Sequence, residues 1–403
     1  MNRRLFAKML ALGAGSLPFL SLRGGDARGE GGDSGSSSPA QPISGEVGRA
    51  PVNVEDMTPL AQAKIPKGAF DYITSGSEGE VTLRENLAAF QRLQIAPPIL
   101  RGVADPDLST TVLGHRLSMP VMLAPASLLA LFHPDGALAC SRAAAAAGTI
   151  FVASTNTGHS VEEIGAAAKG PTWFQLYVPR DRKIARRLIE RAERAGFGAI
   201  VVTVDLGERK DQDRRNRFAV PKDLFLRILR NVGHQQLSDS MTHAELTAFN
   251  QQAWDLAFSW DFFRWLRSVT KLPLIVKGVL TKADALKAVE LGLDGIVVSN
   301  HGGRRLDTSP ASISVLEEIA TAVNGRLDVL LDSGVRRGTD VMKAIALGAK
   351  AVLVGRPYVW GLAANGEQGV HMTLGFFRDE FHNAMFACGC ASVDEVRREL
   401  ILQ

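Results

Sequence analysis

The chain has 403 residues, of which 46% are hydrophobic and 22% charged, and 46 basic against 42 acidic residues give a formal net charge of +4. These proportions exclude a wholly disordered, collagen-like or coiled-coil protein. The nearly even charge balance argues against a dedicated nucleic-acid-binding protein, which would carry a dense basic face. The three cysteines, Cys140, Cys388 and Cys390, are too few for a disulfide framework, and we predict no metal site.

The first residues resemble a twin-arginine export signal. Arg3 and Arg4 are followed by Phe6 and Lys8 and then by a short apolar stretch, so residues 1–23 are predicted to be the signal. The apolar stretch is too short to span a membrane. Residues 24–50 are dominated by Gly, Ser, Pro and Ala, which predicts a disordered linker. We expect an exported, periplasmic protein; the alternative is a basic tail on a cytoplasmic one.

From residue 119 onward, short apolar runs alternate with helical patterns. The runs are continuous rather than alternating, as in strands that are buried on both faces. The predicted strands are Met119–Pro125, Thr149–Ser154, Thr172–Val178, Ala199–Asp205, Pro273–Gly278, Gly295–Asn300, Asp328–Gly334 and Ala351–Pro357. Eight such units predict an α/β fold, a (β/α)8 TIM barrel. An open doubly wound sheet is the alternative, disfavoured because no G-x-G-x-x-G follows the first run.

Two segments lie outside this repeat within the predicted barrel domain, residues 51–403. Residues 50–118 have helical patterns and a short hairpin pattern, and we expect them to form an N-terminal helical cap segment. Residues 207–250, after the fourth strand, are long, charged and irregular. A long connection on the functional face of a barrel predicts a mobile cover loop over an active site.

Polar residues gather where the predicted strands end, which is the face that carries chemistry in this fold. Gly334–Gly338 and Gly355-Arg356 close the last two strands, and a helix is predicted after Gly338. Glycines let backbone N–H groups approach an anion, so we expect a phosphate site there. The alternative is two structural turns with surface arginines.

His301 is the best candidate for a general base, because it lies between a buried strand and two glycines. Asp205, at the end of another strand, would orient its imidazole and stabilise the protonated form. Arg304 would bind a carboxylate in a forked geometry. Lys277 at a buried strand end requires an anionic or electron-rich partner. The alternatives without a catalytic role are a structural histidine at 301, a helix N-cap at Asp205 and a surface salt bridge at Arg304.

Two long motifs resemble the FMN-dependent 2-hydroxy acid oxidases and dehydrogenases, a family that includes glycolate oxidase, lactate oxidase and lactate monooxygenase. They are residues 299–307, Ser-Asn-His-Gly-Gly-Arg-Arg-Leu-Asp, and residues 332–340, Asp-Ser-Gly-Val-Arg-Arg-Gly-Thr-Asp. Shorter matches are Phe70-Asp71-Tyr72, residues 174–177, residues 203–205, Val276-Lys277-Gly278 and residues 355–357. The resemblance extends from about residue 52 to the C-terminus.

The resemblance implies FMN as cofactor and oxidation of an L-2-hydroxy acid to a 2-oxo acid, with O2 or a redox carrier as electron acceptor. The catalytic residues would be Tyr72, Tyr177, Asp205, Lys277 and His301, and the substrate-binding residues Tyr72, Tyr177, Lys210, His301 and Arg304. The cofactor-binding residues would be Pro125, Ala126, Ser127, Ser154, Gln175, Thr203, Lys277, Ser299, Asp332, Ser333, Gly334, Val335, Arg336, Gly355 and Arg356. The resemblance also implies a homo-oligomer, often a tetramer.

This chain departs from the family pattern at three places. Counting back from Asn216-Arg217-Phe218 places Lys210, or its neighbour Arg209, where the family has a second carboxylate-binding arginine. Asn156 replaces a frequent Trp, and Ala126-Ser127 replaces a frequent Thr-Ala. Two alternatives stay open: another FMN barrel enzyme, such as a flavin-dependent diphosphate isomerase, or an FMN-binding protein that has lost catalysis.

Overall fold

The computed structural model describes residues 50–206, 218–233 and 236–402. Eight strands pair in parallel, each with the next in the chain, and the last pairs with the first to close a barrel. They are β4 (Val121–Leu123), β5 (Phe151–Ser154), β6 (Thr172–Leu176), β7 (Ile200–Thr203), β8 (Leu274–Val279), β9 (Gly295–Val298), β10 (Asp328–Leu331) and β11 (Ala351–Val354). The predicted (β/α)8 barrel is confirmed.

The strands are apolar on both faces because each face meets a different core. Along β7, Ile200 and Val202 belong to the cluster between the strands and the surrounding helices. Val201, between them, belongs to a second cluster inside the barrel. Since successive side chains of a strand point to opposite faces, a continuous apolar run is what a barrel strand requires.

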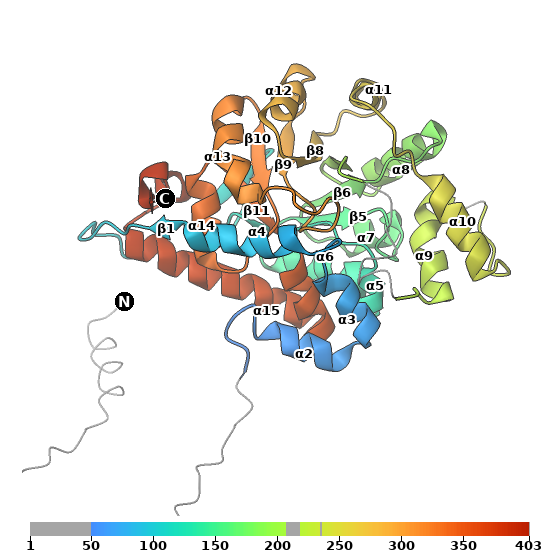
Figure 1. The fold of residues 1–403 in the computed structure, drawn as a ribbon, viewed down its shortest axis with the longest axis horizontal. Helices are drawn as coiled ribbons and strands as arrows, with labels where there is room; N and C mark the ends of the chain where they lie inside the picture. Colours follow the sequence, from blue (N-terminus) through green and yellow to red (C-terminus); the bar gives the residue numbers. More distant parts are fainter. Residues whose placement is uncertain (1–49, 207–217, 234–235, 403) are drawn as a thin grey trace, which may run out of the picture. The chain divides into compact units, whose positions relative to one another are not determined.

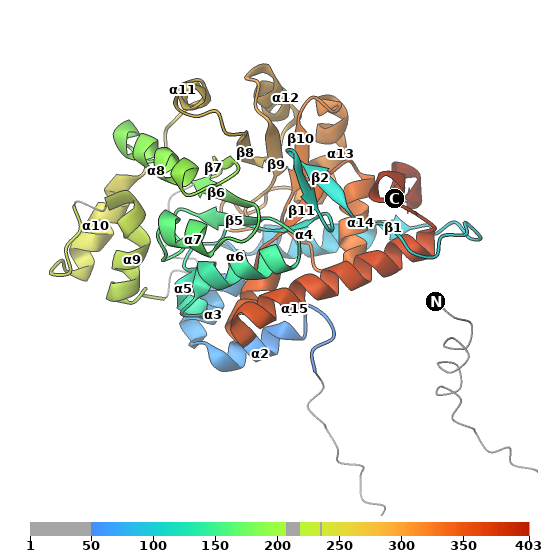
Figure 2. The same cartoon turned by 180° about the vertical axis from the view of Figure 1, so that it is seen from behind.

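Helices follow the strands and surround the barrel (Figures 1 and 2). They are α5 (Leu129–Phe132), α6 (Gly136–Ala146), α7 (Val161–Ala167), α8 (Arg182–Arg194), α11 (Asp261–Val269), α12 (Lys282–Glu290), α13 (Ser312–Val323), α14 (Gly338–Ala346) and α15 (Arg356–Cys388). Two short 3-10 helices, Val393–Glu395 and Arg398–Leu400, follow α15. Cys140, Cys388 and Cys390 are buried, free thiols.

The segment before the barrel contains helices and a hairpin, as predicted. Its elements are α2 (Met57–Lys64), α3 (Lys67–Thr74), α4 (Val81–Arg92), β1 (Gln94–Ile95), β2 (Thr110–Val112) and β3 (His115–Leu117). β1 pairs antiparallel with β12 (Ile401–Leu402), and β2 with β3. Val112 and Leu117 of the hairpin pack with the cluster inside the barrel, so the hairpin closes the amino-terminal end of the barrel.

The irregular structure expected for residues 207–250 is wrong for the part that is described. This part contains α9 (Lys222–Gly233) and most of α10 (His243–Ala253). Leu224, Ile228 and Leu229 of α9 form a small core with Leu246 of α10. The predicted signal and nearly all of the predicted linker lie outside the described residues. Among the residues that are described, no helix is both long and apolar enough to cross a membrane.

Candidate active site

Six polar side chains are buried at the carboxyl ends of six consecutive barrel strands. They are Ser154, Gln175, Thr203, Lys277, Ser299 and Asp332, each no more than 6% exposed. The parallel barrel brings these ends to one mouth. Lys277 Nζ lies 2.8 Å from Ser299 Oγ and 2.7 Å from Asp332 Oδ2. Polar groups at this depth require partners, so the mouth of the barrel is the candidate site.

The predicted catalytic pair is in contact. His301 Nδ1 lies 2.9 Å from Asp205 Oδ1. Burial opposes ionisation of Asp205, but the charges of His301 and Lys277 lower its pKa to about 2. Burial lowers the pKa of His301 to about 4, against the opposing effect of Asp205. Near neutral pH the carboxylate is therefore ionised, Nδ1–H of a neutral imidazole donates to it, and Nε2 is left as a basic nitrogen.

Arg304 lies beside the tyrosines that the resemblance implies. Its guanidinium carbon lies 4.9 Å from the centre of the Tyr72 ring, and Nη1 donates to the carbonyl oxygens of Tyr72 (2.7 Å) and Ser75 (3.0 Å). Burial lowers the pKa of Arg304, while the Tyr72 and Tyr177 hydroxyls partly oppose this effect. The Tyr177 ring packs edge-on against Trp254, 5.8 Å between centres. His301, Arg304, Tyr72 and Tyr177 therefore all lie at the mouth of the barrel.

Lys277 keeps its charge although it is only 3% exposed. Burial disfavours the ammonium form, but Asp332 and Asp205 raise the pKa of Lys277. A fixed cation at the mouth of the barrel stabilises negative charge that develops next to it.

The polar groups of the site fit FMN. Both Oε1 and Nε2 of Gln175 are buried and have no hydrogen-bond partner in the protein. An amide with its donor and its acceptor both unsatisfied matches a ring that presents one acceptor and one donor side by side, as the flavin pyrimidine does. Nearby, Pro125, Ala126 and Ser127 follow β4, and Ser127 Oγ lies 3.4 Å from Ser154 Oγ.

Arg336, which the resemblance implies as a cofactor-binding residue, lies in surroundings that suit an anion. Desolvation lowers the pKa of Arg336 to about 10, and no carboxylate of the described residues lies within ion-pairing distance of it. Its guanidinium lies 5.2 Å from the centre of the Trp360 ring. A desolvated arginine without a carboxylate is suited to an anionic ligand.

The helix after Gly338 does not contribute as expected. α14 begins at Gly338. However, Asp340 accepts from the backbone N–H groups of Arg336 (2.9 Å) and Arg337 (3.0 Å), and Glu380 accepts from that of Gly338 (2.7 Å). These carboxylates occupy the backbone donors of Arg336, Arg337 and Gly338, so these three N–H groups are not available to a phosphate.

Other predicted cofactor residues make contacts within the protein. The Arg356 guanidinium donates to the carbonyl oxygens of Ile73, Gly302 and Ser75 at 2.9–3.0 Å. Ser333 Oγ donates to Asp332 Oδ1 (2.7 Å) and accepts from the Gly302 N–H. Gly334, Val335 and Gly355 lie in the turns after β10 and β11. A cofactor role for these residues stays a prediction.

Four further residues need separate comment. Lys210 and Arg209 lie outside the described residues. Asn156 is partly buried and its Oδ1 has no hydrogen-bond partner. Arg305, which sequence reasoning missed, has a buried, unpartnered Nε and is close enough to His301 to lower its pKa.

The comparisons with known proteins agree with this geometry. Residues 61–403 match the family model described as FMN-dependent dehydrogenase. The chain is 48% identical over 353 residues to glycolate oxidase 1 of Zea mays, covering 87% of this chain and 95% of the relative. It is 45% identical over 349 residues to a peroxisomal (S)-2-hydroxyacid oxidase of Arabidopsis thaliana, covering 86% and 95%.

Solved structures are similar over the same region. A mandelate oxidase aligns with a TM-score of 0.78 and 39% identity, covering 88% of this chain and 98% of that one. A mutant of an active chimera of (S)-mandelate dehydrogenase aligns with a TM-score of 0.80 and 36% identity, covering 87% and 99%. With its barrel, its buried polar mouth and a family match over most of its length, the chain belongs to the FMN-dependent dehydrogenases.

Proposed function

We propose that this protein oxidises an L-2-hydroxy acid, that is an (S)-2-hydroxy acid, to the 2-oxo acid. The observation that carries the proposal is the pairing of neutral His301 with ionised Asp205, beside the partly buried guanidinium of Arg304. Relatives named as glycolate oxidase and (S)-2-hydroxyacid oxidase support the same reaction. FMN, when bound, accepts the two electrons of the oxidation.

The chain's own residues perform the remaining tasks. Arg304 binds the substrate carboxylate, and the hydroxyls of Tyr72 and Tyr177 donate hydrogen bonds to the substrate. His301 Nε2 takes a proton from the substrate, and Asp205 stabilises the resulting imidazolium through Nδ1–H. Lys277, at the end of β8, stabilises negative charge that develops next to it during the reaction.

The overall reaction removes two electrons and two protons from the substrate. They pass either to O2, which becomes hydrogen peroxide, or to a redox carrier. The test is anaerobic mixing of the purified yellow protein with a panel of (S)-2-hydroxy acids, followed by admission of air. Loss of flavin absorbance with at least one acid supports the proposal, and its return in air with peroxide formation identifies O2 as an acceptor. Absence of bleaching with every acid, while FMN stays bound, refutes it.

The diphosphate isomerase and the non-catalytic FMN-binding protein are less well supported. Neither needs a base paired with a carboxylate next to a partly buried guanidinium, and the similarity to hydroxy acid oxidases covers most of the chain. Neither alternative predicts bleaching of the flavin by hydroxy acids, so the same experiment separates the proposed function from both of them.

We further propose that the protein is exported through a twin-arginine signal and forms a homo-oligomer, with a tetramer as the expected state. The Arg3-Arg4 pair and the apolar stretch that follows it support export. Replacement of both arginines by lysine should leave the protein in the cytoplasm in cell fractionation, and an unchanged distribution would contradict export. Light scattering of the purified protein measures the oligomeric state.

A further inference from the structure

The turn that presents His301 and Arg304 has an unusual backbone. His301, Gly302 and Gly303 have φ angles of +58°, +67° and +71° in succession. Glycine adopts this left-handed region freely, whereas residues with a Cβ adopt it rarely and at a cost. His301 therefore stays in this conformation only because the surrounding contacts hold it there.

Each of the three N–H groups of the turn donates to a side-chain oxygen. The acceptors are Ser299 Oγ for His301 (3.1 Å), Ser333 Oγ for Gly302 (2.9 Å) and, for Gly303, Asn300 Oδ1 (3.0 Å) together with the Asn300 carbonyl oxygen (3.1 Å). Two of these acceptors are hydroxyls, which rotate to suit a donor. The third is an amide, which accepts only if its oxygen, and not its nitrogen, faces the turn.

Asn86 of α4 holds the Asn300 amide in place. Asn86 Nδ2 donates to Asn300 Oδ1 (2.9 Å), and Asn300 Nδ2 donates to Asn86 Oδ1 (2.7 Å). Asn300 Nδ2 also donates to the carbonyl oxygen of Pro310 (2.9 Å). Both side chains are buried, at 2% and 5% exposure. The Pro310 carbonyl and the Gly303 N–H set the orientation of the Asn300 amide, and the two bonds with Asn86 hold the amide in that place.

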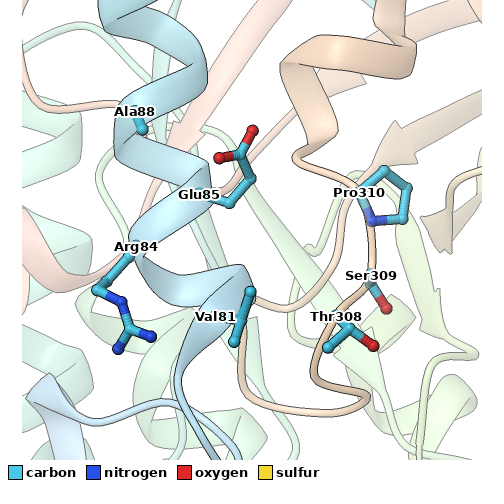
Figure 3. A pocket seen from close by; sticks show the side chains of 7 residues that line it. All are labelled: Val81, Arg84, Glu85, Ala88, Thr308, Ser309 and Pro310. Atoms are coloured by element: carbon cyan, nitrogen blue, oxygen red, sulfur yellow. The ribbon is translucent and has the colours of Figure 1, made fainter.

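The same helix holds the rest of the segment that carries the turn. Asp307 accepts from the N–H groups of Val81 (3.2 Å) and Thr82 (2.8 Å) at the start of α4, and Thr82 Oγ1 donates to the Ser309 carbonyl (3.0 Å). Figure 3 shows the outer edge of this junction, where Glu85 of α4 lies opposite Ser309 and Pro310 across a groove of about 480 Å³. The junction therefore combines the buried amide pair with the contacts of Asp307 and Thr82 at the start of α4.

We infer that Asn86 is a positioning residue for the reaction. By fixing the Asn300 amide, it holds the left-handed turn 301–303 and so places His301 against Asp205 and Arg304 at the substrate. This inference rests on the proposed function for its kinetic readout. The residue touches neither the substrate nor the reacting atoms, and it acts from 214 positions away in the sequence.

The test compares variants at two positions of α4. Asn86→Ala and Asn86→Leu remove both hydrogen bonds, and the leucine fills the volume of the asparagine. Asn86→Asp keeps an acceptor for Asn300 Nδ2 and, as the protonated acid that burial favours, a donor for Asn300 Oδ1. Thr82→Val is the matched control, because it breaks a part-buried bond between the same helix and the same segment without touching Asn300. The FMN-loaded variants are mixed anaerobically with the best hydroxy acid, and the limiting rate and the apparent substrate affinity are recorded with the urea midpoint.

We expect Asn86→Ala and Asn86→Leu to retain FMN but to lose about tenfold to a hundredfold in limiting rate, as small misplacement of catalytic groups does. Asn86→Asp should be faster than Asn86→Ala although it is no more stable, and Thr82→Val should stay within about threefold of the parent rate. Rates that instead follow the urea midpoints across all four variants would overturn the inference. If Asn86→Ala does not fold, Asn86→Leu and Asn86→Asp decide by the same criteria. A parent protein that no hydroxy acid reduces contradicts the proposed function; the inference is then judged by whether the Asn86 variants, unlike Thr82→Val, lose the flavin spectral shift on binding 2-oxo acids.

Discussion

Asp205→Asn tests the electrostatic account of the site most directly. The change removes the charge that faces His301 across 2.9 Å but keeps the size of the side chain. A close charge pair at an effective dielectric constant of about 20 is worth about 4 kcal/mol. Since the imidazolium forms as the proton is taken, most of this energy is lost from the transition state. A loss of 4 kcal/mol corresponds to a rate about a thousandfold lower.

The assay is stopped-flow measurement of flavin absorbance under anaerobic conditions. Asp255→Asn is the control, since it removes a carboxylate that pairs with Arg182 at 3.0 Å outside the site. The control should reduce its flavin at nearly the parent rate. If Asp205→Asn also stays within about tenfold of the parent, the carboxylate does not stabilise the imidazolium and the reasoning is wrong.

Three further changes follow from the same contacts. Arg305→Gln removes a charge that lowers the pKa of His301, so the acid limb of the kcat/KM profile should move to higher pH; a limb that stays in place or moves down contradicts this. Gln175→Leu removes an amide that has no partner in the protein, so it should weaken FMN binding by about tenfold to a hundredfold in titrations of the apoprotein, without lowering apoprotein stability. Folding lowers the pKa of His301 from 6.5 to about 4, so the unfolded chain binds more protons than the folded protein between these pH values. The urea midpoint of unfolding should therefore fall as the pH is lowered from 6.5 towards 4. His301→Gln should reduce that slope, and an unchanged slope would show that other groups cause it.

The barrel could be predicted from the sequence because its strands are short runs that are apolar on both faces. The runs were predicted slightly too long: Ala199–Asp205 becomes β7, Ile200–Thr203, because the last residues leave the sheet and turn towards the mouth. The helices α9 and α10 were missed, although Leu224, Ile228 and Val232 have helical spacing, because charged residues dominate the surrounding segment.

The site was predictable only where its residues follow strand ends. His301, Asp205 and Lys277 stand at such ends, and a parallel barrel must bring them to one mouth. Asn86 carries no such signal, because an asparagine on an amphipathic helix looks like a surface residue until its partner is known. The contact of Glu380 with the Gly338 N–H was missed for the same reason, since Glu380 lies in a distant part of α15.

The hairpin β2–β3 has a consequence for access to the site. Val112 and Leu117 fill the amino-terminal end of the barrel, and the Leu113 N–H donates to Asp328 Oδ2 at 2.8 Å. In the part of the chain that the structure describes, this end is closed, so we expect cofactor, hydroxy acid, 2-oxo product and oxidant to approach from the carboxyl ends of the strands.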